Sequence, residues 1–268
     1  MSGDSALPPE TAVVGGRRLT FYDLSDCLSN ETSAFEFNKH EITYLAPEEI
    51  AAAGAFGLGV DDWPDGKALQ AETVTLSTHS GTHVDAPAHY GPAASGRTMT
   101  IDEVPLSWCY GPGVRVDVRD LDRVEGVRPA DLERELERIG HELSPGDVVL
   151  VWTGTDLRRP GYENAHAGLR REATEFLVDA GVRLIGIDAW TVDRAVDVMV
   201  EEARAGTLAQ AFESHVLGRE KPYLQIERLS NLDALPAPTG FTVVAFPFKI
   251  EGAGAGWSRV VAIVDETP

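Results

Sequence analysis

Three histidines and one aspartate stand close together in the segment HSGTHVDAPAH, residues 79–89. The histidines are His79, His83 and His89, and the aspartate is Asp85. Because the chain has only 7 histidines in 268 residues, an even distribution would place about 0.3 in a window of this length. Two neutral imidazoles with a carboxylate are a common ligand set for zinc or a similar divalent ion, with positions left for water. The segment therefore predicts a metal site.

The residues between the histidines favour a bent chain over a helix. Gly81 and Pro87 both oppose a helix, and β-branched residues stand between them. In an extended chain, residues four apart lie roughly 13 Å from each other, which is too far for one ion to bind both. We therefore expect a strand over residues 72–78 that leads into a curled ligand segment. The alternative is a histidine-rich loop whose rings only hydrogen-bond to the backbone.

Composition and charge exclude several classes of function. With 43 acidic and 23 basic residues the net charge is -20, so duplex nucleic acid and anionic membrane surfaces would repel the chain. The two cysteines, Cys27 and Cys109, stand far apart and outside any metal-ligand spacing, which favours a reducing compartment. No signal peptide or membrane-spanning apolar run is visible. We expect a soluble, cytoplasmic protein that binds neither nucleic acid nor membranes.

Strands and helices alternate through the middle of the chain. Apolar patterning predicts strands over 19–25, 72–78, 113–119, 148–152, 182–188, 223–227, 241–246 and 259–264. It predicts helices over 46–54, 128–143, 169–181 and about 203–217. This alternation favours a single α/β domain with a mixed sheet flanked by helices, over residues 19–268. Residues 1–18 are expected to be a loose leader, and the glycine-rich residues 252–256 a flexible turn.

The segment 79–89 resembles the motif His-x-Gly-Thr-His-x-Asp-x-Pro-x-His of the cyclase-like metal hydrolases. That family includes bacterial kynurenine formamidases, isatin hydrolases and several polyketide cyclases. Further similarity lies in three short segments and one separated pair of residues. They are YDLS at 22–25, VWTG at 151–154, IGID at 185–188, and His215 with Glu227. The resemblance implies a swivelling β/β/α fold, and the segments around 33–45 and 91–108 look more like the longer actinobacterial cyclase branch.

The resemblance also implies roles for particular side chains. His79, His83 and Asp85 look like ligands of a divalent ion, zinc in the first place with manganese as an alternative. His215 and Glu227 look like the distant ligands that complete a site for one or two ions. Without the resemblance, His215 reads as a packed or capping residue and Glu227 as a solvated carboxylate. The resemblance further implies a homodimer or a homotetramer.

His89 has two roles open to it, as a further ligand or as a general base, and the resemblance marks it as the catalytic histidine. Its reference pKa near 6.5 suits proton transfer at neutral pH. Water activated by a divalent ion could attack a formamide, lactam or lactone carbonyl while His89 moves the proton.

Ring closure is the second reaction that the same residues support. With water excluded, an enolate or phenolate of an aromatic substrate could attack a carbonyl within the same molecule. A cyclase of polyketide or related secondary metabolism is the favoured interpretation, and hydrolysis of the kynurenine formamidase or isatin hydrolase type is the alternative. A third interpretation is a non-catalytic binding protein that a metal stabilises.

An aromatic small molecule is the expected substrate, and several aromatic residues are candidates for the wall of its pocket. These candidates are Phe35, Phe37, Tyr44, Trp63, Tyr90, Trp108 and Trp190. Ordinary core packing is the simpler account of each one taken singly. His40 and His166 have no partner at ligand spacing and are expected at the surface.

Overall fold

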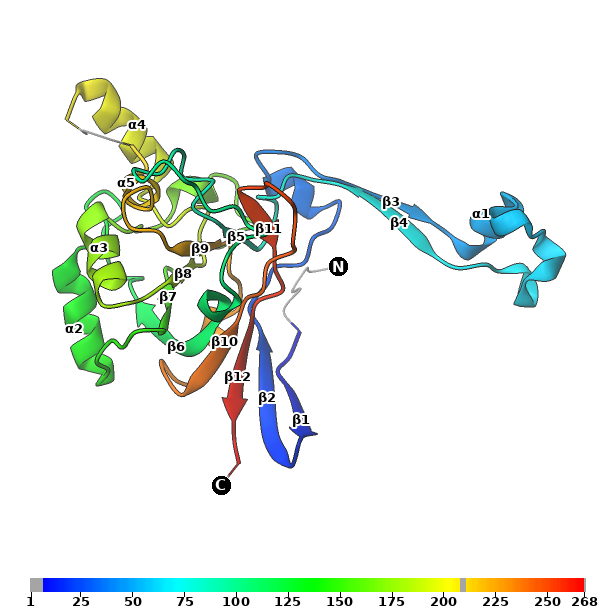
Figure 1. The fold of residues 1–268 in the computed structure, drawn as a ribbon, viewed down its shortest axis with the longest axis horizontal. Coiled ribbons are helices and arrows are strands. Elements are labelled where there is room, and N and C mark those ends of the chain that lie inside the picture. Colours follow the sequence, from blue (N-terminus) through cyan, green and yellow to red (C-terminus); the bar gives the residue numbers. More distant parts are fainter. Residues whose placement is uncertain (1–6, 208–210, 268) are drawn as a thin grey trace.

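One mixed sheet forms the centre of the molecule in a computed structural model that describes residues 7–207 and 211–267 (Figure 1). Over these residues the sheet has ten strands in the order β1-β2-β12-β10-β6-β7-β8-β9-β5-β11. The strands are β1 (Glu10–Val14), β2 (Arg17–Asp23), β5 (His83–Asp85), β6 (Tyr110–Asp117), β7 (Val148–Trp152), β8 (Leu184–Ile187), β9 (Leu224–Glu227), β10 (Phe241–Val244), β11 (Ala255–Trp257) and β12 (Val261–Asp265). Strands β6 to β9 run parallel and the flanking pairs are antiparallel. The α/β fold with a mixed sheet, as expected, is confirmed.

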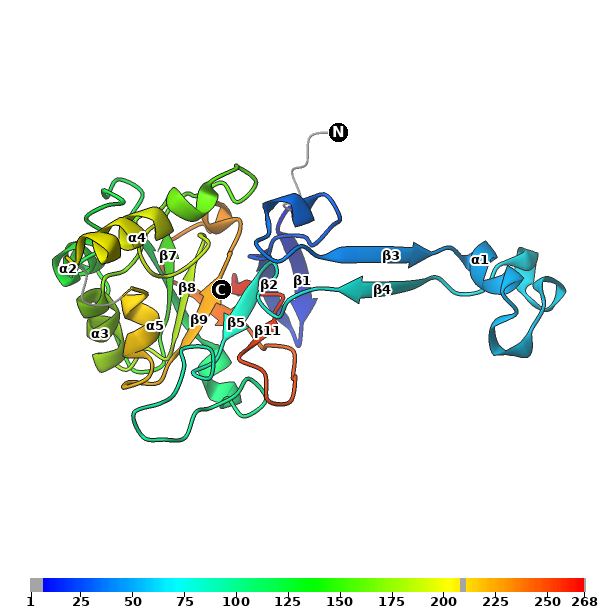
Figure 2. The same cartoon turned by 90° about the horizontal axis from the view of Figure 1, so that it is seen from above.

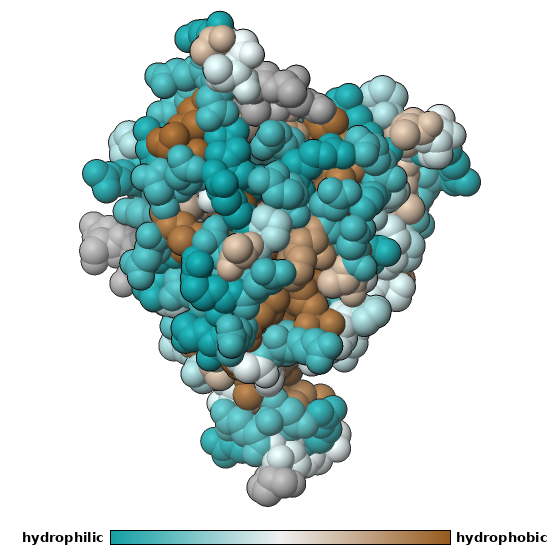
Figure 3. Space-filling model, turned by 90° about the vertical axis from the view of Figure 1, so that its left-hand side faces the viewer, coloured by the Kyte–Doolittle hydropathy of each residue, from teal (hydrophilic) through white to brown (hydrophobic). Residues whose placement is uncertain are grey.

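Helices cover the parallel strands on one side of the sheet (Figures 1 and 2). They are α2 (Pro129–Ile139), α3 (Arg171–Asp179), α4 (Val196–Ala205) and α5 (Glu213–Leu217). The surface of the molecule on this side is largely hydrophilic, with apolar side chains in limited areas (Figure 3). Amphipathic helices produce this pattern when their apolar faces turn toward the sheet.

The central strand β7 shows why the parallel strands are nearly continuous apolar runs. Val149 and Val151 are buried in one core together with Leu177 of α3. Val148 and Leu150 are buried in a second core, which includes residues of β5, β10 and β12. Successive side chains of a strand alternate between faces, so a strand that is covered on both faces is apolar at every position. The two cores hold the parallel strands and thereby fix where their ends lie.

The first part of the chain departs from expectation. Residues 10–18, expected within a loose leader over 1–18, form β1 and the beginning of β2 instead. Gly15 and Gly16 have φ values of 59° and 82°, the left-handed backbone that a two-residue hairpin turn requires. The Gly-Gly pair between two short runs was a usable hairpin signal. Residues 1–6 lie outside the described residues.

Two further expectations are wrong in part. The helix expected over 203–217 is replaced by the end of α4 and by α5. Gly206, with φ 70°, ends α4, and Phe212, with φ 55°, precedes α5. Residues 208–210 lie outside the described residues. The flexible turn expected over 252–256 is shorter than predicted, because its last two residues belong to β11, which pairs with β5.

A two-stranded hairpin projects from the body of the molecule (Figures 1 and 2). Its strands β3 (Glu41–Leu45) and β4 (Ala71–Thr75) pair antiparallel, and α1 (Pro47–Ala52) lies toward its tip with three short 3-10 turns. We call residues 41–75 the arm. The expected helix over 46–54 and strand over 72–78 correspond to α1 and β4, but neither β3 nor the projection was predicted.

Leu177→Ala tests the core between α3 and the sheet. Leu177 is fully buried, so its truncation leaves a cavity and should lower the free energy of unfolding by about 2–5 kcal/mol. Urea denaturation followed by circular dichroism measures this loss. Leu106→Ala, at a side chain that is 68% exposed, is the matched control and should change little. Equal losses in the two variants would contradict the assignment of this core.

Candidate metal centre

The segment 79–89 bends around the short strand β5. Gly81 has a φ of 62°, and a Cβ at this position would lie 2.9 Å from a side-chain carbon of Leu28, so the bend requires glycine. β5 then pairs with β9 on one side and with β11 on the other. This pairing buries His83 and Asp85, which are 1% and 0% exposed. The expected curled segment is therefore present.

Three ligand atoms of this segment meet at one point. His79 Nδ1 lies 2.9 Å from Asp85 Oδ1, and His83 Nε2 lies 3.3 Å from the same oxygen. The two nitrogens, His79 Nδ1 and His83 Nε2, are 3.3 Å apart. Nitrogen ligands of one tetrahedral zinc ion, each about 2.0–2.1 Å from the metal, are separated by about 3.3 Å. The spacing of these atoms therefore fits a shared ion.

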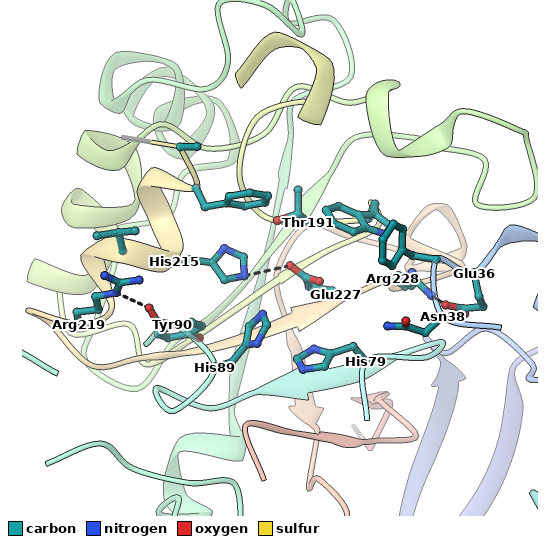
Figure 4. A pocket seen from close by; sticks show the side chains of 15 residues that line it. Glu36, Asn38, His79, His89, Tyr90, Thr191, His215, Arg219, Glu227 and Arg228 are labelled. Carbon is teal, nitrogen blue, oxygen red and sulfur yellow. Dashed lines mark hydrogen bonds and ion pairs between the residues drawn. The ribbon is translucent and has the colours of Figure 1, made fainter. Parts of the chain in front are cut away.

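Glu227 and His215, the two candidate ligands distant in sequence, lie next to this cluster although they belong to other elements. Glu227 ends β9 and lies opposite His83 in the register of β5 with β9. Its carboxylate lies 3.6 Å from His83 Nε2 and 3.8 Å from Nε2 of His215, which belongs to α5. Figure 4 shows the side chains of His79, His89, His215 and Glu227 turned toward one another. The structure thus brings together all the residues proposed as ligands.

His89 lies among these groups rather than apart from them. Its ring is 4.1 Å from the ring of His79 and 5.3 Å from that of His215, between centroids. Ligand atoms of His89, Asp85 and His215 lie within 4.8 Å of one another. Burial and the neighbouring histidines lower the pKa of His89 to about 4. A second ion beside the first is compatible with this second cluster, and Asp85 belongs to both.

The buried carboxylates indicate that the site is built for a cation. Both oxygens of Asp85 and Oε1 of Glu227 are buried, and among the described residues only the imidazoles of the cluster face them. Leaving such charges unpaired is costly, and a bound cation would remove that cost. The Nδ1 of His83 donates to the carbonyl of Gly81 at 2.8 Å, which leaves Nε2 as a free lone pair facing the cluster. These residues fit a divalent ion.

Asp193 orients His215 and was not identified from the sequence. It follows β8, is 1% exposed, and its Oδ2 lies 2.5 Å from Nδ1 of His215. Its Oδ1 accepts the N–H of Ser214 at 2.6 Å, so it also fixes the start of α5. A carboxylate on the outer nitrogen of a histidine is the usual support of a metal ligand. Only the fold connects positions 193 and 215, since no spacing in the sequence does.

The pKa of His215 reflects the same surroundings. Burial alone would lower it, but the hydrogen bond to Asp193 and the charges of Glu227 and Asp85 outweigh burial and raise the pKa to about 9. The carboxylates therefore favour a positive charge at this point. A metal ion would supply that charge in place of the proton, because bound metal and proton compete for the same nitrogen.

Glu36 is a second supporting residue that the sequence did not reveal. Its Oε1 accepts the N–H of Gly81 at 2.8 Å, and its Oε2 forms an ion pair with Arg228. Arg228 is buried, directly follows Glu227, and has a φ of 60°. One carboxylate therefore joins the bend before His83 to the turn after Glu227.

A cavity of about 440 Å³ opens onto the candidate metal centre. Of the predicted aromatic residues, Phe37, Tyr90 and Trp190 line it, and Phe212, which was not predicted, lines it as well. Among the remaining aromatic candidates, Tyr44 and Trp63 lie on the arm, Trp108 packs against the second core, and Phe35 lines a neighbouring groove. The cavity joins an apolar wall to a polar floor, which is typical of a small-molecule site.

His40 and His166 are buried, contrary to expectation. His40 is 5% exposed and its Nε2 lies 2.6 Å from the carbonyl of Ser29. His166 is 1% exposed and its Nε2 lies 2.9 Å from the carbonyl of Asp193. Both rings hydrogen-bond to the backbone, a role that ligand spacing does not detect. His166 thereby supports the loop that carries Asp193.

Asp193→Asn should weaken zinc binding by about 10- to 100-fold, because the amide holds Nδ1 of His215 less firmly than a carboxylate does. Competition with a chromophoric chelator measures the affinity, and circular dichroism checks that the fold is retained. Asp179→Asn, at an exposed aspartate on α3, is the control and should bind zinc as the unchanged protein does. An unaltered zinc affinity in Asp193→Asn would show that Asp193 does not support a metal ligand.

The family model named Cyclase matches residues 22–194 of this chain. A kynurenine formamidase of Salinibacter ruber is 28% identical over 208 residues, covering 74% of this chain and 81% of the relative. An isatin hydrolase of Roseibium aggregatum is 28% identical over 220 residues, covering 75% and 77%.

Solved structures show the same fold. Isatin hydrolase A from Labrenzia aggregata, bound to benzyl benzoate, aligns with a TM-score of 0.70 at 24% identity and covers 92% of this chain and 94% of its own. A structure described as a novel cyclase aligns with a TM-score of 0.70 at 18% identity, covering 90% and 87%. Within the described residues, no helix has the length and apolar character to cross a membrane.

Proposed function

The chain belongs to the Cyclase family, and we propose that it is a zinc-dependent hydrolase of an amide, lactam or lactone carbonyl in a small aromatic molecule. The observation that carries this proposal is the cluster of buried carboxylate oxygens and facing imidazole nitrogens at the floor of an aromatic-walled cavity. The names of two relatives, kynurenine formamidase and isatin hydrolase, support hydrolysis of an aryl amide or lactam.

Different side chains would bind the ion and the substrate in such a reaction. His79, His83 and Asp85 would hold the ion, with His215 and Glu227 completing the site. A divalent ion lowers the pKa of bound water to about 7 and polarises a carbonyl oxygen. The aromatic wall, with Trp190 and Phe212, would hold the ring of the substrate and keep bulk water from the carbonyl.

His89 would move the proton. It lines the cavity and stands next to His79, so one of its ring nitrogens can accept a proton from the attacking water. The water oxygen forms a bond to the carbonyl carbon, and the bond from that carbon to nitrogen or oxygen breaks. His89 then returns its proton to the leaving atom, which completes the hydrolysis and restores the neutral ring.

Ring closure of a polyketide was the favoured interpretation of the sequence and stays a prediction. The cavity volume of about 440 Å³ is near the lower end of the roughly 300–1,000 Å³ of small-molecule sites. This volume favours a substrate of one or two rings over a large polyketide intermediate. A purely structural metal would need a closed ligand shell, whereas His79, His89, His215 and Glu227 all face the cavity. Hydrolysis is therefore the better-supported reaction.

Turnover of N-formylkynurenine and of isatin by the zinc-loaded protein tests the proposal. Absorbance spectroscopy follows loss of the formyl group and opening of the lactam ring. We expect hydrolysis of at least one of them, abolished by a chelator and restored by added zinc. Failure on both, and on an aryl lactone as a third carbonyl class, would overturn the assignment of hydrolysis and return ring closure to first place.

His89→Ala should lower kcat by about 10²- to 10⁴-fold, because a positioned proton carrier contributes about that much. The zinc content per chain, measured by elemental analysis, should stay near that of the unchanged protein. His141→Ala, at a partly exposed histidine paired with Asp147, is the control and should retain activity. Loss of zinc together with activity in His89→Ala would instead make His89 a ligand.

A further inference from the structure

Two arginines line the cavity, and they differ in whether a carboxylate of the protein neutralises them. Arg228 forms its ion pair with Glu36. No carboxylate of the described residues lies within ion-pair distance of Arg219, although the chain has 43 acidic and 23 basic residues. Figure 4 shows the two arginines on opposite sides of the candidate metal ligands. Arg219 therefore places an unneutralised positive charge at one end of the cavity.

The carbonyl of Tyr90 anchors the side chain of Arg219, whose Nε donates a hydrogen bond to it. Tyr90 is itself held firmly, because it is 2% exposed and its ring stacks on that of Tyr223 with 5.6 Å between centroids. Its hydroxyl donates to the carbonyl of Tyr223 at 3.2 Å. A Cβ at Gly218 would lie 2.2 Å from the Tyr90 ring, so the ring packs directly against this glycine. The guanidinium is thus fixed to a well-packed residue.

This anchoring leaves the outer edge of the Arg219 guanidinium open. Only Nε is bonded, and no acceptor of the described residues bonds to Nη1 or Nη2. Nη2 lies close to Gly91, where an added Cβ would approach it to 2.8 Å and where φ is 99°. A larger residue at position 91 would therefore displace the guanidinium. The free N–H groups of such an edge match the two oxygens of a carboxylate.

Arg219 lies one helical turn beyond the candidate ligand His215. The turn continues past the end of α5, since the N–H of Arg219 donates to the carbonyl of Val216 at 3.1 Å. Side chains four positions apart on a helix are neighbours. Both side chains line the cavity. A group bound by Arg219 would therefore lie beside the candidate metal centre, within reach of the same small molecule.

We propose that Arg219 is a specificity-determining residue that binds a carboxylate of the substrate, several bonds away from the carbonyl that is hydrolysed. This inference rests on the proposed function and narrows its substrates to aryl amides, lactams or lactones that carry a carboxylate. A net charge of -20 repels anions from the protein as a whole, so selection of an anionic substrate needs a local cation. An arginine supplies that charge together with two parallel hydrogen bonds.

Arg219→Gln removes the charge, and Arg219→Lys keeps the charge without the paired N–H groups. The probes are 3-phenylpropanoate and its uncharged amide, and isothermal titration calorimetry measures the affinity of the zinc-loaded protein for each. Arg219→Gln should weaken binding of the acid by about 10- to 100-fold, and Arg219→Lys should weaken it less. Binding of the amide should change far less than binding of the acid. Arg134→Gln, at an exposed arginine on α2, is the control with the same change of charge.

Removal of zinc separates Arg219 from the ion as the group that binds the carboxylate. The preference for the acid over the amide should survive chelation of zinc, with circular dichroism checking that the fold is retained. A preference that disappears with the zinc, or that Arg219→Gln leaves intact, would overturn the inference. An unchanged protein that binds the acid no more tightly than the amide would overturn it as well.

Turnover of N-formylkynurenine and of its methyl ester separates this inference from the proposed function. Arg219→Gln should raise KM for the carboxylate substrate by about 10- to 100-fold and raise KM for the ester far less. If neither compound is hydrolysed while Arg219 still binds the acid, the assignment of hydrolysis fails and the carboxylate site stands. If both are hydrolysed and Arg219→Gln leaves KM for the carboxylate substrate unchanged, the carboxylate site fails and hydrolysis stands.

Discussion

Two buried carboxylates that face only imidazole rings across the cluster are the constraint on which the rest of the site depends. Asp85 and Glu227 lie on the adjacent strands β5 and β9, and the pairing of these strands holds the backbone of both residues in place. Charges buried in this way are costly unless a counter-charge is near. The surrounding histidines reduce that cost, and a divalent ion would reduce it further. The fold therefore places two costly charges side by side at the point where the imidazoles converge.

The position of the site follows from the topology of the sheet. The parallel series β6 to β9 ends where antiparallel β5 begins, and Glu227 is the last residue of β9. Asp193 follows the neighbouring parallel strand β8. Ligands of open α/β sheets bind at the carboxyl ends of such strands, at the point where the order changes. The candidate metal centre, its supporting residue Asp193 and the cavity all lie at this point.

The sequence was most informative where several metal-binding residue types stand together in one short segment. The segment 79–89 could be read directly, because three histidines and an aspartate in a bendable stretch have few structural explanations. Most strands of the sheet were also predictable, since two cores make the parallel strands apolar throughout. His215 and Glu227 were accessible only through family resemblance. Each is an ordinary polar residue until the pairing of β5 with β9 and the packing of α5 bring it to the segment.

The sequence could not show polar contacts between residues that are far apart along the chain. Asp193 contacts His215, 22 positions away, and Glu36 contacts Gly81, 45 positions away, and no periodicity in the sequence encodes such distances. His40 and His166 were misplaced for a related reason, because a backbone hydrogen bond can satisfy a buried ring at any spacing. The arm was missed because its strands lack the alternation of a half-buried sheet, having no buried face within this chain.

The carboxylate of Glu36 ties together two turns that lie far apart along the chain, one before His83 and one after Glu227. Glu36 is not one of the proposed metal ligands, but it holds the turns beside two of them, His83 and Glu227. Under the proposed function, a substitution at this one position would change the affinity for the ion without altering the residues that bind it. Residue 36 is therefore the position to substitute when the aim is to change the rigidity of the site while keeping the same ligand residues.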